Sequence, residues 1–163
     1  MPKTSHFFLL GSVLAVPFFG TASAQAFTIV NHFGQCVEDR GGDTTDRNPV
    51  VSRSCFGLFQ QQWNWEPGGN ITGIGTGEAG DPGAGSHRKC LSAFGSVDGT
   101  PVTLIECHAV LRGVQKWFYE FPGLIINTGL QKCLTVENPA QGTQLTVRTC
   151  DPANGNQLFS LRS

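Results

Sequence analysis

Few side chains in this sequence have the types and spacing that covalent chemistry requires. The four histidines are far apart along the chain, and none has the spacing of a metal ligand with another. The twelve aspartate and glutamate residues are scattered, so no pair is singled out for acid–base catalysis, although catalysis by two carboxylates stays open. No GxSxG or other nucleophile motif occurs. The sequence therefore predicts a protein that has no catalytic residues, no metal and no cofactor, and that is not an enzyme.

The six cysteines are the reactive side chains with a regular spacing. They fall into three pairs, each separated by a similar length of chain: Cys36 and Cys55, Cys90 and Cys107, and Cys133 and Cys150. Sequence alone allows many pairings of six cysteines, but three similar intervals in order favour three local disulfides. Each bridge would be worth roughly 3 kcal/mol in the chain-entropy model. A zinc site is the alternative, and it lacks a CxxC pair or clustered histidines.

A motif of glutamine, any residue and an aromatic residue recurs at a nearly constant distance behind the first cysteine of each pair. It occurs three times, as Gln61 with Trp63, Gln115 with Trp117, and Gln157 with Phe159. In a strand, residues i and i+2 point to the same side, so each glutamine faces the same way as its ring. One large ring per repeat can fill a core shared by three copies, and the amide can satisfy buried turn backbone. We therefore expect these six residues in the structural core rather than at a ligand.

The segments between these landmarks predict β-structure. Each repeat holds four short runs rich in Val, Ile, Leu, Thr and aromatic residues, separated by Gly, Asp, Asn and Pro. No segment has a sustained apolar period of 3.6 residues over a helical length. The prediction is an all-β domain of twelve strands at 25–163, with repeats at about 25–69, 70–122 and 123–163. The insertion at 78–87 is expected to be an exposed loop.

The N-terminus has the features of a secretory signal. Lys3 precedes an uncharged, mostly apolar run, and Ala22 and Ala24 have the A-x-A spacing of a signal peptidase site. The run is too short to span a bilayer, although a membrane anchor is the alternative. We expect residues 1–24 to be removed near Ala24, leaving an extracellular or periplasmic protein without membrane insertion. With a net charge of −1 the chain has no basic face, so nucleic acid is not an expected partner.

The three glutamine motifs and the three cysteine pairs in register resemble the ricin B-type β-trefoil lectins, over essentially the whole mature chain. The resemblance implies a six-stranded barrel capped by three hairpins, with pseudo-threefold symmetry and up to three shallow sugar sites. In each site a carboxylate two residues after the first cysteine accepts sugar hydroxyls. An aromatic residue two before the second cysteine stacks on the sugar, and an amide just before the motif glutamine holds a further hydroxyl.

The first repeat keeps part of that sugar-binding pattern. Glu38, with Asp39 beside it, occupies the carboxylate position, and Gln60 occupies the amide position. The aromatic position holds Arg53, which can lie flat against a ring but would favour an acidic glycan. The resemblance therefore makes these four residues the main candidates for carbohydrate binding.

The other two repeats keep less of the pattern. The three positions are Ser92, Ile105 and Val114 in the second repeat, and Thr135, Arg148 and Asn156 in the third. Nothing in the second repeat could hold a sugar in the manner of the family. In the third only the amide of Asn156 survives, and it is the remaining candidate for carbohydrate binding.

These observations predict a secreted, lectin-like β-trefoil that binds a glycan or glycoconjugate. The alternative is a protein-interaction module with a partner protein chain. A stand-alone trefoil with altered sugar positions is similar to the cell-binding subunits of the cytolethal distending toxins, which deliver a separate catalytic chain. Free-standing trefoils also serve as inhibitors of hydrolases.

Overall fold

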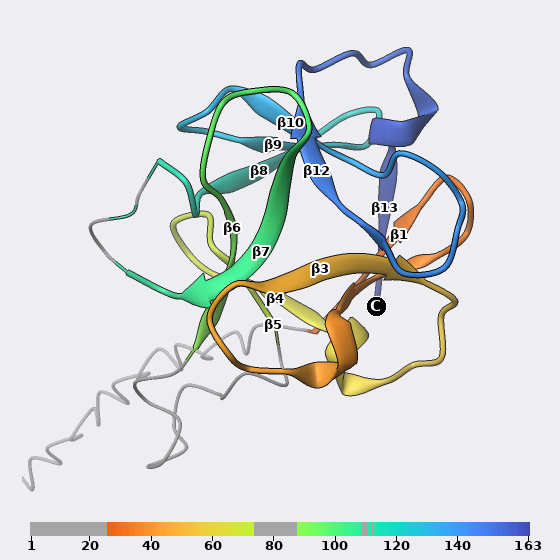
Figure 1. The fold of residues 1–163 in the computed structure, drawn as a ribbon. Coiled ribbons are helices and arrows are strands. Elements are labelled where there is room, and N and C mark those ends of the chain that lie inside the picture. The colour runs from red at the N-terminus through yellow and green to blue at the C-terminus, as the bar shows by residue number, and fades with distance from the viewer. Residues whose placement is uncertain (1–25, 74–87, 109–110, 112) are drawn as a thin grey trace, which may run out of the picture.

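The computed structural model describes residues 26–73, 88–108, 111 and 113–163, and almost all of its regular structure is short strands (Figure 1). The predicted signal peptide at 1–24 and the predicted loop at 78–87 lie outside these residues. The strands are β1 (Thr28–Asn31), β2 (Cys36–Asp39), β3 (Asn48–Arg53), β4 (Trp63–Trp65), β5 (Ile71–Gly73), β6 (Lys89–Ala93), β7 (Thr100–Glu106), β8 (Trp117–Glu120), β9 (Leu124–Asn127), β10 (Lys132–Thr135), β11 (Thr143–Gln144), β12 (Thr146–Arg148) and β13 (Phe159–Arg162). The single-turn 3-10 helices are η1 (Arg40–Gly42), η2 (Phe59–Gln61) and η4 (Gly155–Gln157).

The strands of the described residues form one curled antiparallel sheet. Its main path runs β13-β1-β2-β3-β7-β12-β10-β9-β8, and β4, β5, β6 and β11 attach beside this path. Figure 1 shows the strands arranged around a common centre, and in chain order they form three successive repeats: β1–β4, β5–β8 and β9–β13. This arrangement confirms the predicted all-β, β-trefoil fold.

The third repeat differs from the predicted four strands, because its third run is divided in two at Leu145. On one side of this residue β11 pairs with β3 of the first repeat. On the other side β12 pairs with β10 of its own repeat and with β7 of the second. Leu145 is fully buried, and its N–H donates to the carbonyl of Val50 at 2.9 Å. The run thus changes partners where its leucine enters the core, so the described residues form thirteen strands rather than the predicted twelve.

The core sits where the three repeats meet, and it contains the same kind of side chain from each. The motif rings Trp63, Trp117 and Phe159 are all buried in one cluster, with no more than 3% of any residue exposed. The other members of this cluster are Ile29, Val37, Val50, Ile71, Leu91, Ala93, Val102, Leu104, Ile125, Leu134, Leu145 and Val147. The two indole N–H groups donate to the carbonyls of Val37 and Leu91, which satisfies the polar end of each ring inside the core.

Each motif glutamine bonds the backbone on both sides of the second cysteine of its repeat. The amide of Gln61 donates to the carbonyl of Ser54 at 2.9 Å and accepts from the N–H of Phe56 at 2.8 Å. Gln115 does the same around Cys107, and Gln157 does the same around Cys150. All three glutamines are buried, so each amide replaces the water that these backbone groups would otherwise need.

The three disulfides are confirmed as local bridges. The pairs are Cys36–Cys55, Cys90–Cys107 and Cys133–Cys150, with sequence separations of 19, 17 and 17 residues. In each repeat the bridge and the glutamine converge on the same turn, because the amide bonds the residues directly flanking the bridged cysteine. Covalent and hydrogen-bonded constraints therefore act together on three equivalent turns.

Gly123 lies where the chain between β8 and β9 touches β13. Its N–H and carbonyl are both used, because Gly123 donates to Glu120 and accepts from the N–H of Phe159 at 2.9 Å. Its φ is +150°, and a Cβ built there would lie 2.6 Å from the carbonyl oxygen of Phe159. Both the conformation and the space at this position require glycine.

Replacing Gly123 with alanine is expected to lower the free energy of unfolding by about 2 kcal/mol or more, because the new methyl group meets backbone that cannot move aside. Urea unfolding of the oxidised protein measures this. Gly57→Ala is the matched control, since Gly57 has a φ of +68° but nothing within 4 Å of a built Cβ. The control should cost about 1 kcal/mol. Equal losses in the two variants would contradict the steric argument.

Candidate functional site

The carboxylate of Glu38 lies at the end of β2, and it is buried between two partners rather than open to solvent. Only 2% of the residue is exposed. Oε2 accepts from the amide of Gln61 at 2.8 Å, while Oε1 lies 3.4 Å from Nε of Arg53 on the paired strand β3. The Arg53 side chain is 47% exposed. A ligand hydroxyl could therefore reach Oε1 only by displacing the arginine, and sugar binding by Glu38 and Arg53 stays a prediction.

Asp39 follows Glu38 but occupies a different environment. The residue is 1% exposed, and its Oδ1 accepts a short hydrogen bond from the amide of Asn48, whereas Oδ2 is buried and accepts none within the described structure. Burial raises the pKa of this carboxyl to about 7, against the lowering effect of the Asn48 bond. Asp43 and Glu38 add smaller repulsive contributions. Asp39 thus has no surface to offer a sugar in this conformation, and its predicted binding role is untested.

Gln60 lies in η2, immediately before the core glutamine, and it is half-buried. The neighbouring ring of Phe59 packs on Gly42 of η1: a Cβ built at Gly42 would lie 3.1 Å from the ring and 3.8 Å from Oε1 of Gln60. Phe59 is 55% exposed. An amide and a flat apolar ring therefore lie side by side at the edge of the first repeat. The chain supplies an aromatic surface here although the expected aromatic position holds Arg53.

In the second repeat, the positions that correspond to the sugar site carry no ionisable or amide group. Ser92 is fully buried, where its hydroxyl donates to the carbonyl of Cys90 at 2.8 Å and accepts from the amide of Gln115 at 3.1 Å. Ile105 and Val114 are partly buried apolar residues. At these three described positions the second repeat therefore offers no group that could hold sugar hydroxyls in the way the first repeat is predicted to.

In the third repeat, a carboxylate that the sequence did not indicate joins the expected Asn156 and the arginine at the aromatic position. Glu137 Oε1 lies 2.5 Å from Nε of Arg148 and accepts from the hydroxyl of Thr146 at 2.9 Å. The amide of Asn156 donates to the Glu137 carbonyl at 3.4 Å. The carboxylate raises the pKa of the Arg148 guanidinium above its ordinary value. Glu137, Arg148 and Asn156, here called the third-repeat cluster, thus place a carboxylate, a guanidinium and an amide together.

The position of Glu137 explains why it was missed. The expected carboxylate position holds Thr135, a buried residue whose hydroxyl donates to the carbonyl of Cys133 at 3.0 Å. Glu137 comes two residues later, and in an extended chain it returns to the same side as Thr135. The Glu137 side chain is 33% exposed, in contrast to the buried Glu38. The i+2 relation to Thr135 was the signal that could have identified it.

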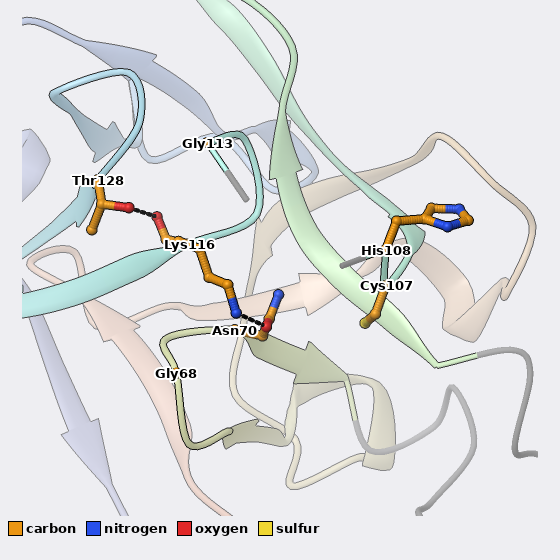
Figure 2. Close-up of a pocket in the computed structure, with 7 residues that line it drawn as sticks. All are labelled: Gly68, Asn70, Cys107, His108, Gly113, Lys116 and Thr128. Carbon is orange, nitrogen blue, oxygen red and sulfur yellow. Dashed lines mark hydrogen bonds between the residues drawn. The ribbon is translucent and has the colours of Figure 1, made fainter. Parts of the chain in front are cut away.

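A pocket of about 720 Å³ lies away from these clusters (Figure 2). Lys116 crosses it, with its ammonium bonded to Oδ1 of Asn70 and its backbone carbonyl accepting from the hydroxyl of Thr128 at 3.3 Å. His108 stands at the opposite side in Figure 2, pointing away from Lys116. The lining described here has one cation already bonded to an amide, and no carboxylate or nucleophile that could act with it.

Neither a metal centre nor a membrane span is found among the described residues. No three His, Cys, Asp or Glu side chains in that part of the chain lie together as metal ligands. Within residues 26–73, 88–108, 111 and 113–163, no helix is long and apolar enough to cross a membrane.

Comparison with known proteins finds one family. Residues 25–159 match the model of the ricin-type beta-trefoil lectin domain. The chain is 28% identical to beta-galactoside-specific lectin 3 of Viscum album over 143 residues, and 31% identical to the ribosome-inactivating protein SNAI of Sambucus nigra over 114 residues. These alignments cover 86% and 70% of this chain but only 22% and 17% of the two relatives. The chain thus spans about a fifth of the length of these curated relatives.

Two solved structures show the same fold at low sequence identity. The agglutinin from Abrus precatorius superposes with a TM-score of 0.72 at 20% identity, over 90% of this chain and 51% of that chain. The designed threefold-symmetric protein ThreeFoil gives a TM-score of 0.71 at 18% identity, over 85% of this chain and 98% of that chain.

The buried Asp39 makes a specific prediction about pH. The folded pKa of about 7 lies above the ordinary value of 3.8, so the folded state holds its proton to higher pH than the unfolded state does. Stability should therefore be lost as the pH rises from about 4 to about 7, by up to about 4 kcal/mol from this group. Asp39→Asn removes the buried charge. The free energy of unfolding of this variant, measured by urea unfolding, should exceed that of the parent protein by a large amount at pH 8 and by close to zero at pH 4.

Asp43→Asn is the matched control for this prediction. Asp43 is exposed, and hydrogen bonds from Thr45 lower its pKa, so its charged form stabilises the fold and its replacement should destabilise the protein at pH 8. At pH 8, Asp39→Asn should thus stabilise the protein and Asp43→Asn should destabilise it. An Asp39→Asn gain of equal size at pH 4 and pH 8 would contradict the assignment.

Proposed function

The chain belongs to the ricin-type beta-trefoil lectin domain family, and from this premise we propose that it is a secreted carbohydrate-binding protein without catalytic activity. The observation that carries the proposal is the third-repeat cluster. There Glu137, Arg148 and Asn156 combine an acceptor, a planar donor and an amide beside one another at the surface. Polyhydroxylated ligands need such paired donors and acceptors, because each hydroxyl must exchange water for an equally good partner.

The third-repeat cluster would hold a sugar without dismantling the fold. Oε1 of Glu137 is occupied by Thr146 and Arg148, while Oε2 accepts no hydrogen bond from the described residues. Oε2 is the atom that would accept a sugar hydroxyl, and the Arg148 guanidinium, with its side chain 42% exposed, would lie against the ring or donate to it. The amide of Asn156 would donate to a further hydroxyl, since it holds the Glu137 carbonyl only at 3.4 Å.

The first repeat would provide a second site, which becomes accessible only when Arg53 moves away from Glu38. Phe59 offers the exposed ring on which the apolar face of a sugar stacks, and Gln60 beside it offers an amide. Glu38 would accept a hydroxyl through Oε1 once Arg53 swings away, while the bond from Gln61 to Oε2 keeps the carboxylate in place. Asp39 would act behind this carboxylate, as a neighbouring charge rather than a contact.

Secretion and the absence of catalysis are part of the proposal. The three disulfides support an oxidising destination, together with the signal-like sequence that ends near Ala24. Glu38 is paired with Arg53 and Glu137 with Arg148, so neither of these two carboxylates is poised as a general acid or base.

The second candidate function is a cell-binding or delivery module that works with a separate protein chain. It is favoured by exposed apolar side chains in the loop after Cys55, where Phe56 is 69%, Leu58 41% and Phe59 55% exposed. Some relatives are named ribosome-inactivating proteins, and this chain covers less than a fifth of their length. Co-purification of a partner chain from the native host would favour this candidate. Binding to an array without any partner would favour the lectin.

A glycan array tests the proposal, with Glu137→Gln as the deciding variant. The substitution keeps the size of the side chain and an acceptor for Thr146, but it removes the charge that a sugar hydroxyl would use. Affinity for array ligands should fall by about tenfold or more, since a hydrogen bond to a charged group contributes about 1.5–3 kcal/mol. Glu38→Gln should reduce only the part of the binding that the first repeat supplies.

Glu66→Gln is the matched control, because Glu66 pairs with Arg88 at 3.0 Å outside both clusters. It should leave binding unchanged. A silent array would overturn carbohydrate binding. Binding that resists both Glu137→Gln and Glu38→Gln would place the sugar elsewhere on the molecule.

A further inference from the structure

Six strands around the motif rings close into a barrel. They pair as β13 with β1, β4 with β5, and β8 with β9. Backbone hydrogen bonds join each pair to the next, from Trp63 to Phe27, from Trp117 to Gly69, and from Phe159 to Gly123. Beyond these bonds the chain turns back at 66–70 and at 120–123, and the described residues begin at 26 and end at 163. One end of the barrel is therefore bordered by two short turns and by both ends of the described chain.

A second layer of large apolar side chains lies at this end of the barrel. Each motif ring is followed two residues later by one of them, at Trp65, Tyr119 and Leu161. Because residues i and i+2 of a strand point to the same side, these side chains lie over the motif rings on the way out of the core. Tyr119 is 41% exposed and Leu161 is 37% exposed, whereas Trp65 is partly buried. The core thus continues into a layer that is partly in solvent.

Phe27 extends this layer between two of its members. Leu161 pairs with Ile29 on β1, so Phe27 is its diagonal neighbour on the same side of the sheet. The Phe27 ring also stacks on Trp65, with the ring centroids 6.1 Å apart. The side chains of Leu161, Phe27 and Trp65 therefore follow one another along the rim of the barrel.

Phe121 stands at the edge of the same layer, and 90% of this residue is exposed. It lies in the turn after β8, and the bond from Phe159 to Gly123 holds this turn against β13. A ring that stays almost wholly in water adds little to the stability of the fold, so its position indicates a role at the surface. We call the following five residues the barrel-end face: Phe27, Trp65, Tyr119, Phe121 and Leu161.

The polar and charged groups on and around the barrel-end face are balanced. The hydroxyl of Tyr119 donates to the carbonyl of Phe159 at 3.0 Å, so the polar end of this ring already has a partner. In the turn after β4, Glu66 pairs with Arg88 at 3.0 Å. The last residues of β8 and β13, Glu120 and Arg162, are exposed and have opposite charges. A face of this kind has no excess of positive charge with which to attract anionic lipid headgroups.

The chain that precedes the described residues enters the domain at this face. The uncharged, mostly apolar run of the signal-like sequence ends at Gly20, seven residues before Phe27. Seven residues span at most about 25 Å. A signal sequence enters the bilayer during export, so the face around Phe27 would emerge next to the membrane.

We propose that the barrel-end face adsorbs to the surface of a neutral, zwitterionic lipid bilayer without crossing it. The rings of Phe121 and the side chain of Leu161 would enter the boundary between headgroups and acyl chains, since they are the outermost apolar groups of the face. Tyrosine and tryptophan are the side chains that membrane proteins concentrate at headgroup level, and Trp65 and Tyr119 would lie there. The inference goes beyond the proposed carbohydrate binding, and it uses none of the residues of the first-repeat or third-repeat sites.

Co-sedimentation with phosphatidylcholine vesicles that contain no glycolipid tests the proposal, with oxidised protein exported from the full chain. Saturable partitioning is expected. Salt should not weaken it, and added phosphatidylserine should not strengthen it, because the face is neutral. The tryptophan emission should shift to shorter wavelength. Since Trp63 and Trp117 are already buried, this shift reports on Trp65.

The deciding variants are Phe121→Ser and Leu161→Ser. Each should lower the vesicle partition coefficient by about fivefold or more, because less apolar surface leaves water on binding. Urea unfolding checks that Phe121→Ser folds as the parent does, which its exposure predicts. Phe56→Ser is the matched control. Phe56 is 69% exposed, but it precedes β4 and so lies at the opposite end of this strand from Trp65. This control should leave partitioning unchanged.

Three results would overturn the inference: no partitioning, partitioning into anionic vesicles alone, or partitioning that Phe121→Ser does not change. The last result would also be the sign of binding through residues 1–24. A dimer that Phe121→Ser dissociates, seen by analytical ultracentrifugation in protein that ignores vesicles, would assign the face to a second copy of the chain instead.

The membrane proposal and the lectin proposal fail separately, because the vesicles carry no sugar. Vesicle binding by a protein that is silent on the glycan array would leave the barrel-end face assigned and overturn carbohydrate binding. Array binding that depends on Glu137, by a protein that does not bind vesicles, would do the reverse.

Discussion

The fold depends on three buried glutamine amides, each of which holds the turn around a bridged cysteine. An amide is suited to this position because it offers a donor and an acceptor at once, so the carbonyl before the cysteine and the N–H after it are both satisfied. Without these bonds, the turns would place unpaired backbone beside the core. The rings two residues later can pack around one centre because the glutamines have already set the path of the chain.

The same amides constrain what the surface can do. The second proton of the Gln61 amide goes to Glu38, and that of Gln115 goes to Ser92. In the first and second repeats, the residue two positions after the first cysteine therefore also serves the core. In the second repeat Ser92 accepts the bond from the Gln115 amide, but it has no carboxylate that could accept a sugar hydroxyl. In the first repeat Glu38 meets the structural requirement through Oε2, while Arg53 pairs with its other oxygen.

The fold could be read from the sequence because its determinants repeat. Three glutamines, three rings and three cysteine pairs in register predict three equivalent repeats whose glutamines and rings meet in one core. The break at Leu145 was not foreseeable, since it reflects which neighbouring strand each half of the run meets in space. From the sequence, Glu38 was predicted to be an accessible sugar-binding carboxylate. Its pairing with Arg53 could not be predicted, because it is a contact between two neighbouring strands. Glu137 was not recognised, because its pairing with Arg148 joins residues that are eleven apart in the sequence.

The backbone bond between Arg47 and Leu104 ties a residue of the first repeat to a strand of the second. A pocket of about 300 Å³ over β7 is lined by Arg47 of the first repeat and by residues of the second, Phe94, Thr100, Pro101, Thr103 and Ile105. A substitution at Arg47 would therefore change the surface of the neighbouring repeat.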